Sequence, residues 1–97
     1  RTVKVFGLRV DLDDLENKLS ENGLKAYALE LEGAILLVTD LNEIKQDIVE
    51  YLSNVVALNK SCFKVVVLDS IPRTLNSKVN YSTLKERLID IAAQGAK

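Results

Sequence analysis

The sequence has 97 residues, of which 47% are hydrophobic and 28% are charged, and this composition is typical of one globular domain, 1–97, that can bury a core. Thirteen basic and fourteen acidic residues leave a formal net charge of −1, which excludes a general electrostatic attraction to nucleic acid or to an anionic membrane. No apolar run approaches the roughly 20 residues that cross a bilayer, and the first residues lack the apolar core of a signal peptide, so we expect a cytoplasmic protein without a membrane span.

The chain opens with a predicted strand over 3–10, "VKVFGLRV", in which apolar residues alternate up to an interruption at Gly7. Glycine inside a strand pattern marks a bulge, a twist or a place where backbone passes close to another group. The pattern does not choose between these interpretations of Gly7.

A helix over 12–22 follows, because leucines recur three or four positions apart. Asp11 stands at the N-cap position, and Asn22-Gly23 supplies the stop signal. Asp14 and Glu16 lie in the first turns, where carboxylates stabilise the helix dipole, and we interpret both as structural.

The middle of the chain predicts a hairpin and then a helix. Two strand-like runs, 24–31 and 34–39, are joined by a short link through Glu32-Gly33, which favours an antiparallel pair. A capping box of Asp40 with Glu43 then predicts a helix over 41–57. The apolar stripe of this helix contains Leu41, Ile44, Ile48, Leu52 and Val55.

The run "FKVVVLDSI", residues 63–71, is nearly continuous in apolar and β-branched residues and predicts a central strand. Just before it lies Cys62, the only cysteine, which has no partner for an intramolecular disulfide and which we interpret as an inert thiol. Because the sequence also lacks histidine, His-based triads are excluded and no metal site is expected.

A polar loop around Lys78 separates this strand from a last helix, which Ser82 is predicted to cap and which ends before Gly95. Its apolar face contains Leu84, Leu88 and Ile91. The predicted order is β-α-β-β-α-β-loop-α, an α+β domain with helices flanking a small mixed sheet. Ferredoxin-like modules have a similar order and host many unrelated functions, so this architecture does not name the chemistry.

The segment "IPRTLNSKVNYSTL" resembles the last core motif of the adenylate-forming superfamily, approximately "lPrTxsGKidrxxL". This superfamily comprises acyl-CoA and aryl-CoA synthetases, peptide-synthetase adenylation domains and luciferases. The matching positions are held by Pro72, Arg73, Thr74, Lys78, Val79 and Leu84. Asn80 stands where the family usually has Asp, and Ser77 stands where it has the glycine before the lysine.

The opening segment "VKVFGLRVDLDDLE", residues 3–16, is similar to the family's hinge-proximal motif "iKxxGfRIelxEIE" and aligns without a gap. The matching residues are Lys4, Gly7, Arg9, Val10, Asp11, Leu12, Asp14, Leu15 and Glu16. Together the two motifs enclose nearly the whole chain. The family's hinge residue would directly precede Arg1, and the chain starts without Met, so the resemblance implies a C-terminal lid domain trimmed from a longer ligase near its interdomain hinge.

The resemblance implies a ligase that joins a carboxylic acid to ATP, supplied as Mg-ATP, and then passes the acyl group to the thiol of CoA or of a carrier protein's phosphopantetheine. The large N-terminal domain of the same polypeptide would hold the ATP and acyl sites, so we expect the isolated domain to be inactive. For the first step the resemblance implies Lys78 as the catalytic residue, between the carboxylate and the α-phosphate. For the second step it implies that Gly7, Leu8 and Arg9 line the pantetheine tunnel, with Arg9 directed to CoA phosphates or to the other domain.

Two alternatives accompany this interpretation. One is a free-standing ferredoxin-like module that binds a small ligand or a partner chain, and the other is a family relative that has lost catalysis. The only indication of lost catalysis is Ser77. If that position needs a positive φ, serine costs about 1 kcal/mol there, so we expect altered loop flexibility rather than an inactive enzyme.

Overall fold

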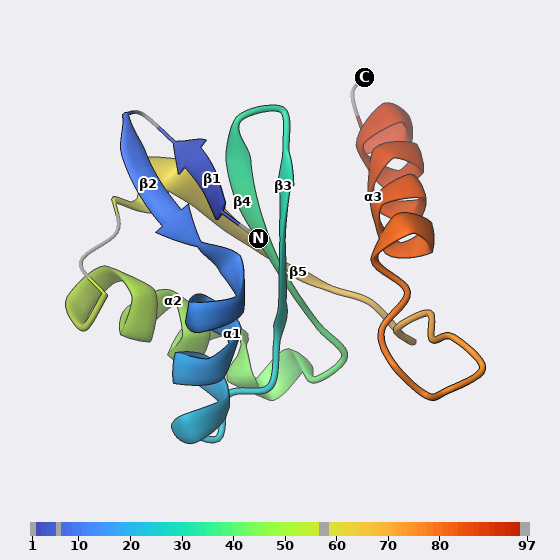
Figure 1. The fold of residues 1–97 in the computed structure, drawn as a ribbon, viewed down its shortest axis with the longest axis horizontal. Coiled ribbons are helices and arrows are strands. Elements are labelled where there is room, and N and C mark those ends of the chain that lie inside the picture. The colour runs from blue at the N-terminus through green and yellow to red at the C-terminus, as the bar shows by residue number, and fades with distance from the viewer. Residues whose placement is uncertain (1, 6, 57–58, 96–97) are drawn as a thin grey trace.

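The computed structural model describes residues 2–5, 7–56 and 59–95 (Figure 1). The strands are β1 Thr2–Val5, β2 Leu8–Asp11, β3 Tyr27–Leu31, β4 Ala34–Thr39 and β5 Phe63–Val67. The helices are α1 Leu12–Glu21, α2 Lys45–Asn54 and α3 Tyr81–Gly95, with short 3-10 helices η1 Asn42–Ile44 and η2 Lys60–Cys62. This arrangement confirms the α+β class.

A mixed three-stranded sheet in the order β3-β4-β5 forms the centre of the fold. β3 and β4 are the predicted antiparallel hairpin, and β5 pairs with β4 in parallel. The prediction that 63–71 is a central strand was wrong, because β4 is central and β5 ends at Val67. The run of apolar residues in β5 is nearly continuous because both faces of the strand are packed. An edge strand that lies between two helical layers has two packed faces, as a central strand does.

The predicted single strand over 3–10 is instead an antiparallel hairpin of β1 and β2, whose register pairs Val5 with Leu8. The chain reverses at Gly7, whose φ of +80° lies in the left-handed region that glycine adopts readily. Alternating apolar residues therefore continue through a two-stranded hairpin, and the pattern alone does not reveal the reversal.

Helices cover both faces of the sheet (Figure 1). On one face α1 and α2 bury Leu15, Leu19, Ile48 and Leu52, and the β1–β2 hairpin adds Val3 and Val10 at the margin of this cluster. On the other face α3 buries Leu84 and Leu88 against Leu29, Leu36 and Val38. The sheet thus separates two apolar clusters, and successive residues of β4 alternate between them.

The helix caps agree with the sequence-based prediction for α1 and differ from it for α2 and α3. Asp11 caps α1, since its Oδ1 accepts from the amides of Asp13 and Asp14 at 3.0 and 3.1 Å. The predicted capping box of Asp40 with Glu43 does not form, because η1 precedes α2 and neither has a side-chain cap hydrogen bond. Asn80 replaces the predicted Ser82 as the cap of α3, since its Oδ1 accepts from the Thr83 amide at 3.1 Å.

The helix predicted over 41–57 is correspondingly shorter, and position 57 lies outside the described residues. Only the middle of its apolar stripe is buried, because Leu41 precedes η1 and Val55 follows α2, and both are exposed. The final helix extends to Gly95 rather than ending before it, and its Ile91 is exposed. Within the described ranges, every helix is too short or too polar to cross a membrane.

Candidate functional site

The loop that carries Lys78 is a small hairpin closed by its own backbone. The Asn80 amide donates to the Pro72 carbonyl at 2.9 Å, and the Thr74 amide donates to the Lys78 carbonyl at 2.7 Å. An isolated antiparallel bridge between Arg73 and Val79 lies between these two hydrogen bonds. Residues 72–80, named the lysine loop from here on, are therefore an ordered hairpin between β5 and α3.

The turn of the lysine loop requires an unusual backbone conformation at Ser77. The Ser77 amide donates to the Thr74 carbonyl at 3.0 Å, which closes a four-residue turn, and Ser77 has a φ of +65°. A turn followed by a left-handed residue that forms a bulge is a common hairpin connection, and glycine is preferred at the left-handed position. Ser77 thus occupies a position that favours glycine, which is the residue at this place in the motif that the loop resembles.

Arg73 ties the lysine loop to the sheet. Its Nη1 donates to the Ser77 carbonyl at 3.1 Å, and its Nη2 donates to the hydroxyl of Tyr27 on β3 at 3.2 Å. The guanidinium carbon also lies 5.8 Å from the centroid of the Tyr27 ring, within range of a cation–π interaction. One side chain therefore connects the turn of the loop with the edge strand of the sheet.

The side chain of Lys78 is exposed and does not pack against the apolar core. Leu75, at the tip of the same loop, is fully exposed. An exposed ammonium on an ordered loop is available to an anionic group that approaches from outside the domain.

The residues expected at the pantetheine tunnel lie at the turn between β1 and β2, on the opposite side of the domain from the lysine loop (Figure 1). A Cβ built on Gly7 would meet nothing within 4 Å, so its positive φ explains this glycine and close packing within the domain does not. Leu8 pairs with Val5 in the hairpin, and its side chain lies outside the described part of the structure. The structure therefore does not bring Gly7 and Leu8 together with Lys78.

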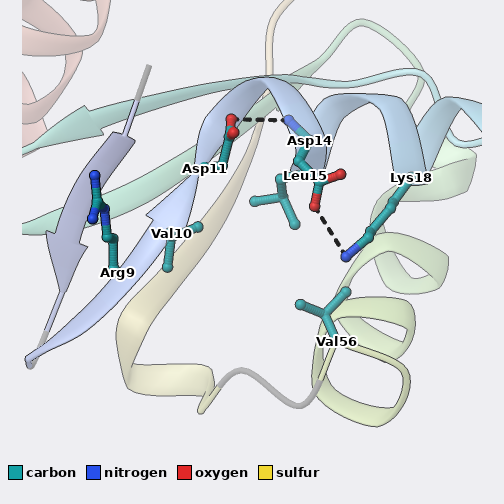
Figure 2. Close-up of a pocket in the computed structure, with 7 residues that line it drawn as sticks. All are labelled: Arg9, Val10, Asp11, Asp14, Leu15, Lys18 and Val56. Atoms are coloured by element: carbon teal, nitrogen blue, oxygen red, sulfur yellow. Dashed lines mark hydrogen bonds and ion pairs between the residues drawn. The ribbon is translucent and has the colours of Figure 1, made fainter.

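Arg9 is exposed and lines a pocket of about 230 Å³ beside α1 (Figure 2). Lys18 lies at the other end of this pocket and forms an ion pair with Asp14 at 3.0 Å. The hydrogen bond from Lys18 to Asp14 and the charge of that carboxylate raise the pKa of Lys18. The remaining lining residues are Val10, Asp11, Leu15 and Val56. Two acidic and two basic side chains balance one another, so this lining does not select an anionic ligand.

Glu16 makes structural contacts that the sequence analysis missed. Its carboxylate accepts from the Ala28 amide at 2.7 Å and from the Tyr81 hydroxyl at 2.8 and 2.9 Å. It therefore links α1 with β3 and with the first residue of α3. Since Leu12 and Leu19 are buried and lie four and three positions away, the helical spacing alone places Glu16 near the packed face.

The described residues contain no group of three or more Cys, Asp or Glu side chains that could hold a metal ion, and Cys62 is buried with a free thiol. Comparison with known proteins found no family model and no curated protein that matches this chain.

Proposed function

We propose that the chain is the C-terminal lid domain of an AMP-forming, acyl-activating ligase, and that Lys78 supplies the ammonium for acyl-adenylate formation. The observation that carries this proposal is the left-handed Ser77 directly before an exposed Lys78. The motif that the loop resembles has glycine before its lysine, and a left-handed residue is the conformational reason for glycine at that position. The sequence resemblance and the backbone geometry thus support the same assignment.

The chemistry of the first step suits this lysine. A carboxylate and the α-phosphate of Mg-ATP repel each other as they approach bonding distance, and a fixed cation in a site sheltered from water offsets that repulsion. Lysine provides a compact charge on a long side chain, whereas a guanidinium favours flat, paired acceptors. The large N-terminal domain of the same polypeptide would hold the ATP and the carboxylic acid, and closure of the lid would complete the site.

For the second step we propose that the β1–β2 turn, with Gly7, Leu8 and Arg9, faces the pantetheine arm of CoA or of a carrier protein. This turn and the lysine loop lie on opposite sides of the domain, so one closed state would present only one of these two segments to a common site (Figure 1). This separation supports a lid that uses two orientations, one for each step. A cytoplasmic location belongs to this proposal, since ATP and CoA are cytoplasmic substrates.

The proposal is tested with Lys78→Ala in the full-length enzyme that carries this chain. We expect the exchange of pyrophosphate into ATP, which reports acyl-adenylate formation, to fall by about 100-fold to 1,000-fold. Thiol transfer from a supplied acyl-adenylate should stay near the wild-type rate. The matched control is Lys25→Ala, which removes another exposed lysine outside the helices and strands and should leave both rates unchanged. An equal loss of both steps, or no loss, contradicts the assignment.

The second step is tested with Gly7→Leu, which should slow thiol transfer and spare acyl-adenylate formation. Gly33→Leu is a matched control, because Gly33 is also a hairpin-turn glycine with a φ of +80° and open space beside it. Both substitutions place leucine at the same positive φ, so a difference between them reports the ligand that passes Gly7. Equal thiol transfer in the two variants removes Gly7 from the tunnel.

A further inference from the structure

Tyr27 is a fixed anchor on the sheet beside the lysine loop. It is the first residue of β3, pairs with the buried Val38 on β4, and packs half-buried against the apolar cluster under α3. Its hydroxyl accepts the hydrogen bond from Arg73 described above, although the two residues are 46 positions apart. Neither sequence motif includes Tyr27.

The other hydrogen bond of Arg73 ends on the peptide group that precedes the lysine. The Ser77 carbonyl accepts from Arg73 Nη1 at 3.1 Å, and this carbonyl belongs to the planar unit that joins Ser77 to Lys78. Fixing the direction of that carbonyl fixes the peptide plane and with it the position of the Lys78 Cα. The Lys78 carbonyl, which accepts from the Thr74 amide at 2.7 Å, holds the following peptide plane, and the two planes together set the direction in which the lysine side chain leaves the backbone. The left-handed φ of Ser77 makes an external restraint relevant here, because serine itself disfavours this conformation.

From this geometry we infer that Tyr27 is a positioning residue for Lys78 and acts through Arg73; the inference rests on the proposed function. The guanidinium of Arg73 lies over the tyrosine ring, and the tyrosine hydroxyl accepts from one guanidinium nitrogen. The forked donor of Arg73 therefore presents its other nitrogen to the Ser77 carbonyl. Tyr27 does not touch the reacting groups. It determines how often the ammonium stands where the carboxylate meets the α-phosphate, and a small misplacement of such a group strongly lowers a rate.

The inference predicts a selective kinetic effect in the full-length enzyme. Tyr27→Phe removes the hydroxyl and keeps the ring, and it should lower kcat for acyl-adenylate formation by about 5-fold, the effect of one net hydrogen bond. KM for ATP and thiol transfer from a supplied acyl-adenylate should not change. Arg73→Lys keeps the charge but loses the fork and should lower the same kcat by about 10-fold.

A double-variant cycle separates positioning from a general loss of structure. Because Tyr27 acts only through Arg73, the variant that combines Tyr27→Phe with Arg73→Lys should be no slower than Arg73→Lys alone. Hydrogen exchange of the peptide that spans 72–80 should become faster in Tyr27→Phe. The control is Tyr51→Phe, at a half-buried tyrosine on α2, which should change neither the kinetics nor the exchange of that peptide.

The outcomes distinguish failure of this inference from failure of the proposed function. A wild-type rate in Tyr27→Phe beside a slow Lys78→Ala overturns the inference alone, and so do fully additive losses in the double variant. A wild-type rate in Lys78→Ala overturns the proposed function and with it the role of Tyr27. Equal slowing of thiol transfer by Tyr27→Phe also overturns the inference, because it indicates general disruption of the domain.

Discussion

The hydroxyl of Tyr81, at the start of α3, donates to the carboxylate of Glu16 on α1 across 65 positions of the chain. The same carboxylate accepts from the backbone amide of Ala28 on β3, at 2.7 Å. The two helices pack on opposite faces of the sheet, so this group of hydrogen bonds is a polar link between the layers. It also fixes the end of the lysine loop, because Tyr81 directly follows that loop.

Replacing Glu16 should lower stability more than replacing other acidic residues of α1. Glu16→Ala removes a charged acceptor from two partly buried donors, and we expect the free energy of unfolding to fall by about 2–3 kcal/mol. Glu16→Gln keeps one acceptor oxygen and should lose less. Urea denaturation measures both variants, with Glu21→Ala, an exposed residue of the same helix, as the control. A Glu16→Ala loss as small as that of Glu21→Ala contradicts this role.

Ser77→Gly should stabilise the protein. Serine at a φ of +65° costs about 1 kcal/mol or somewhat more, and glycine removes most of that cost even though it makes the unfolded chain more flexible. The expected net change is a gain of about 0.5 kcal/mol in the free energy of unfolding, because the added flexibility of the unfolded chain offsets part of the relieved strain. The matched control is Ser20→Gly, an exposed serine within α1, where glycine should instead destabilise the helix. A loss of stability in Ser77→Gly would argue against strain in the turn.

Asn80 should tolerate aspartate but not alanine. Its Oδ1 caps α3 by accepting from the Thr83 amide, so Asn80→Ala should lower the free energy of unfolding by about 1 kcal/mol. Asn80→Asp keeps the acceptor, adds a negative charge at the positive end of the helix dipole, and gives the residue usual in the family's motif. Thermal unfolding of both variants tests this, with Ser82→Ala as the control because Ser82 is not the cap. Equal losses in Asn80→Ala and Ser82→Ala would contradict the assignment.

The ion pair of Lys18 with Asp14 should contribute to stability below, but not far above, the ordinary lysine pKa of 10.5. The hydrogen bond and the charge of Asp14 raise the pKa of Lys18 in the folded state. A raised folded pKa gives a contribution that is complete below the unfolded pKa and is lost as the pH rises through the folded value. The stability difference between the wild type and Lys18→Gln should therefore shrink as the pH rises above 10.5. It should also be small, since both side chains are well exposed, and a difference that grows with pH reverses the sign argument.

Local signals in the sequence predict most of the fold. The Asn22-Gly23 stop, the Asp11 cap and the Glu32-Gly33 turn each depend on residues within a few positions, and the structure has all three features. Strand order depends on contacts between distant segments, so an apolar run such as 63–71 indicates burial on two faces without indicating a neighbour on each side. The prediction of a single strand through Gly7 fails for a similar reason. Apolar residues alternate with the same period before and after the tight turn, so the pattern does not reveal that the chain reverses there.

The candidate site likewise has some features that local sequence signals predict and others that they do not. The lysine loop is contiguous in sequence, and the glycine of the motif that it resembles already indicates the left-handed conformation found at Ser77. The contact of Tyr27 with Arg73 spans 46 positions and has no local signal. Glu16 did have one, since it lies on the same helical face as Leu12 and Leu19, but a carboxylate in the first turns of a helix has a sufficient explanation in the dipole.

The division of the core by the sheet has a consequence for how the domain opens. α3 contributes to the cluster on one face only, while α1, α2 and the first hairpin pack on the other. Detachment of the last third of the chain therefore breaks one apolar cluster and leaves the other intact. We expect this last third to unfold locally at a lower free energy than the whole domain. Protease attack under native conditions should then begin after β5 and yield a trimmed, still structured remnant of the first two-thirds of the chain.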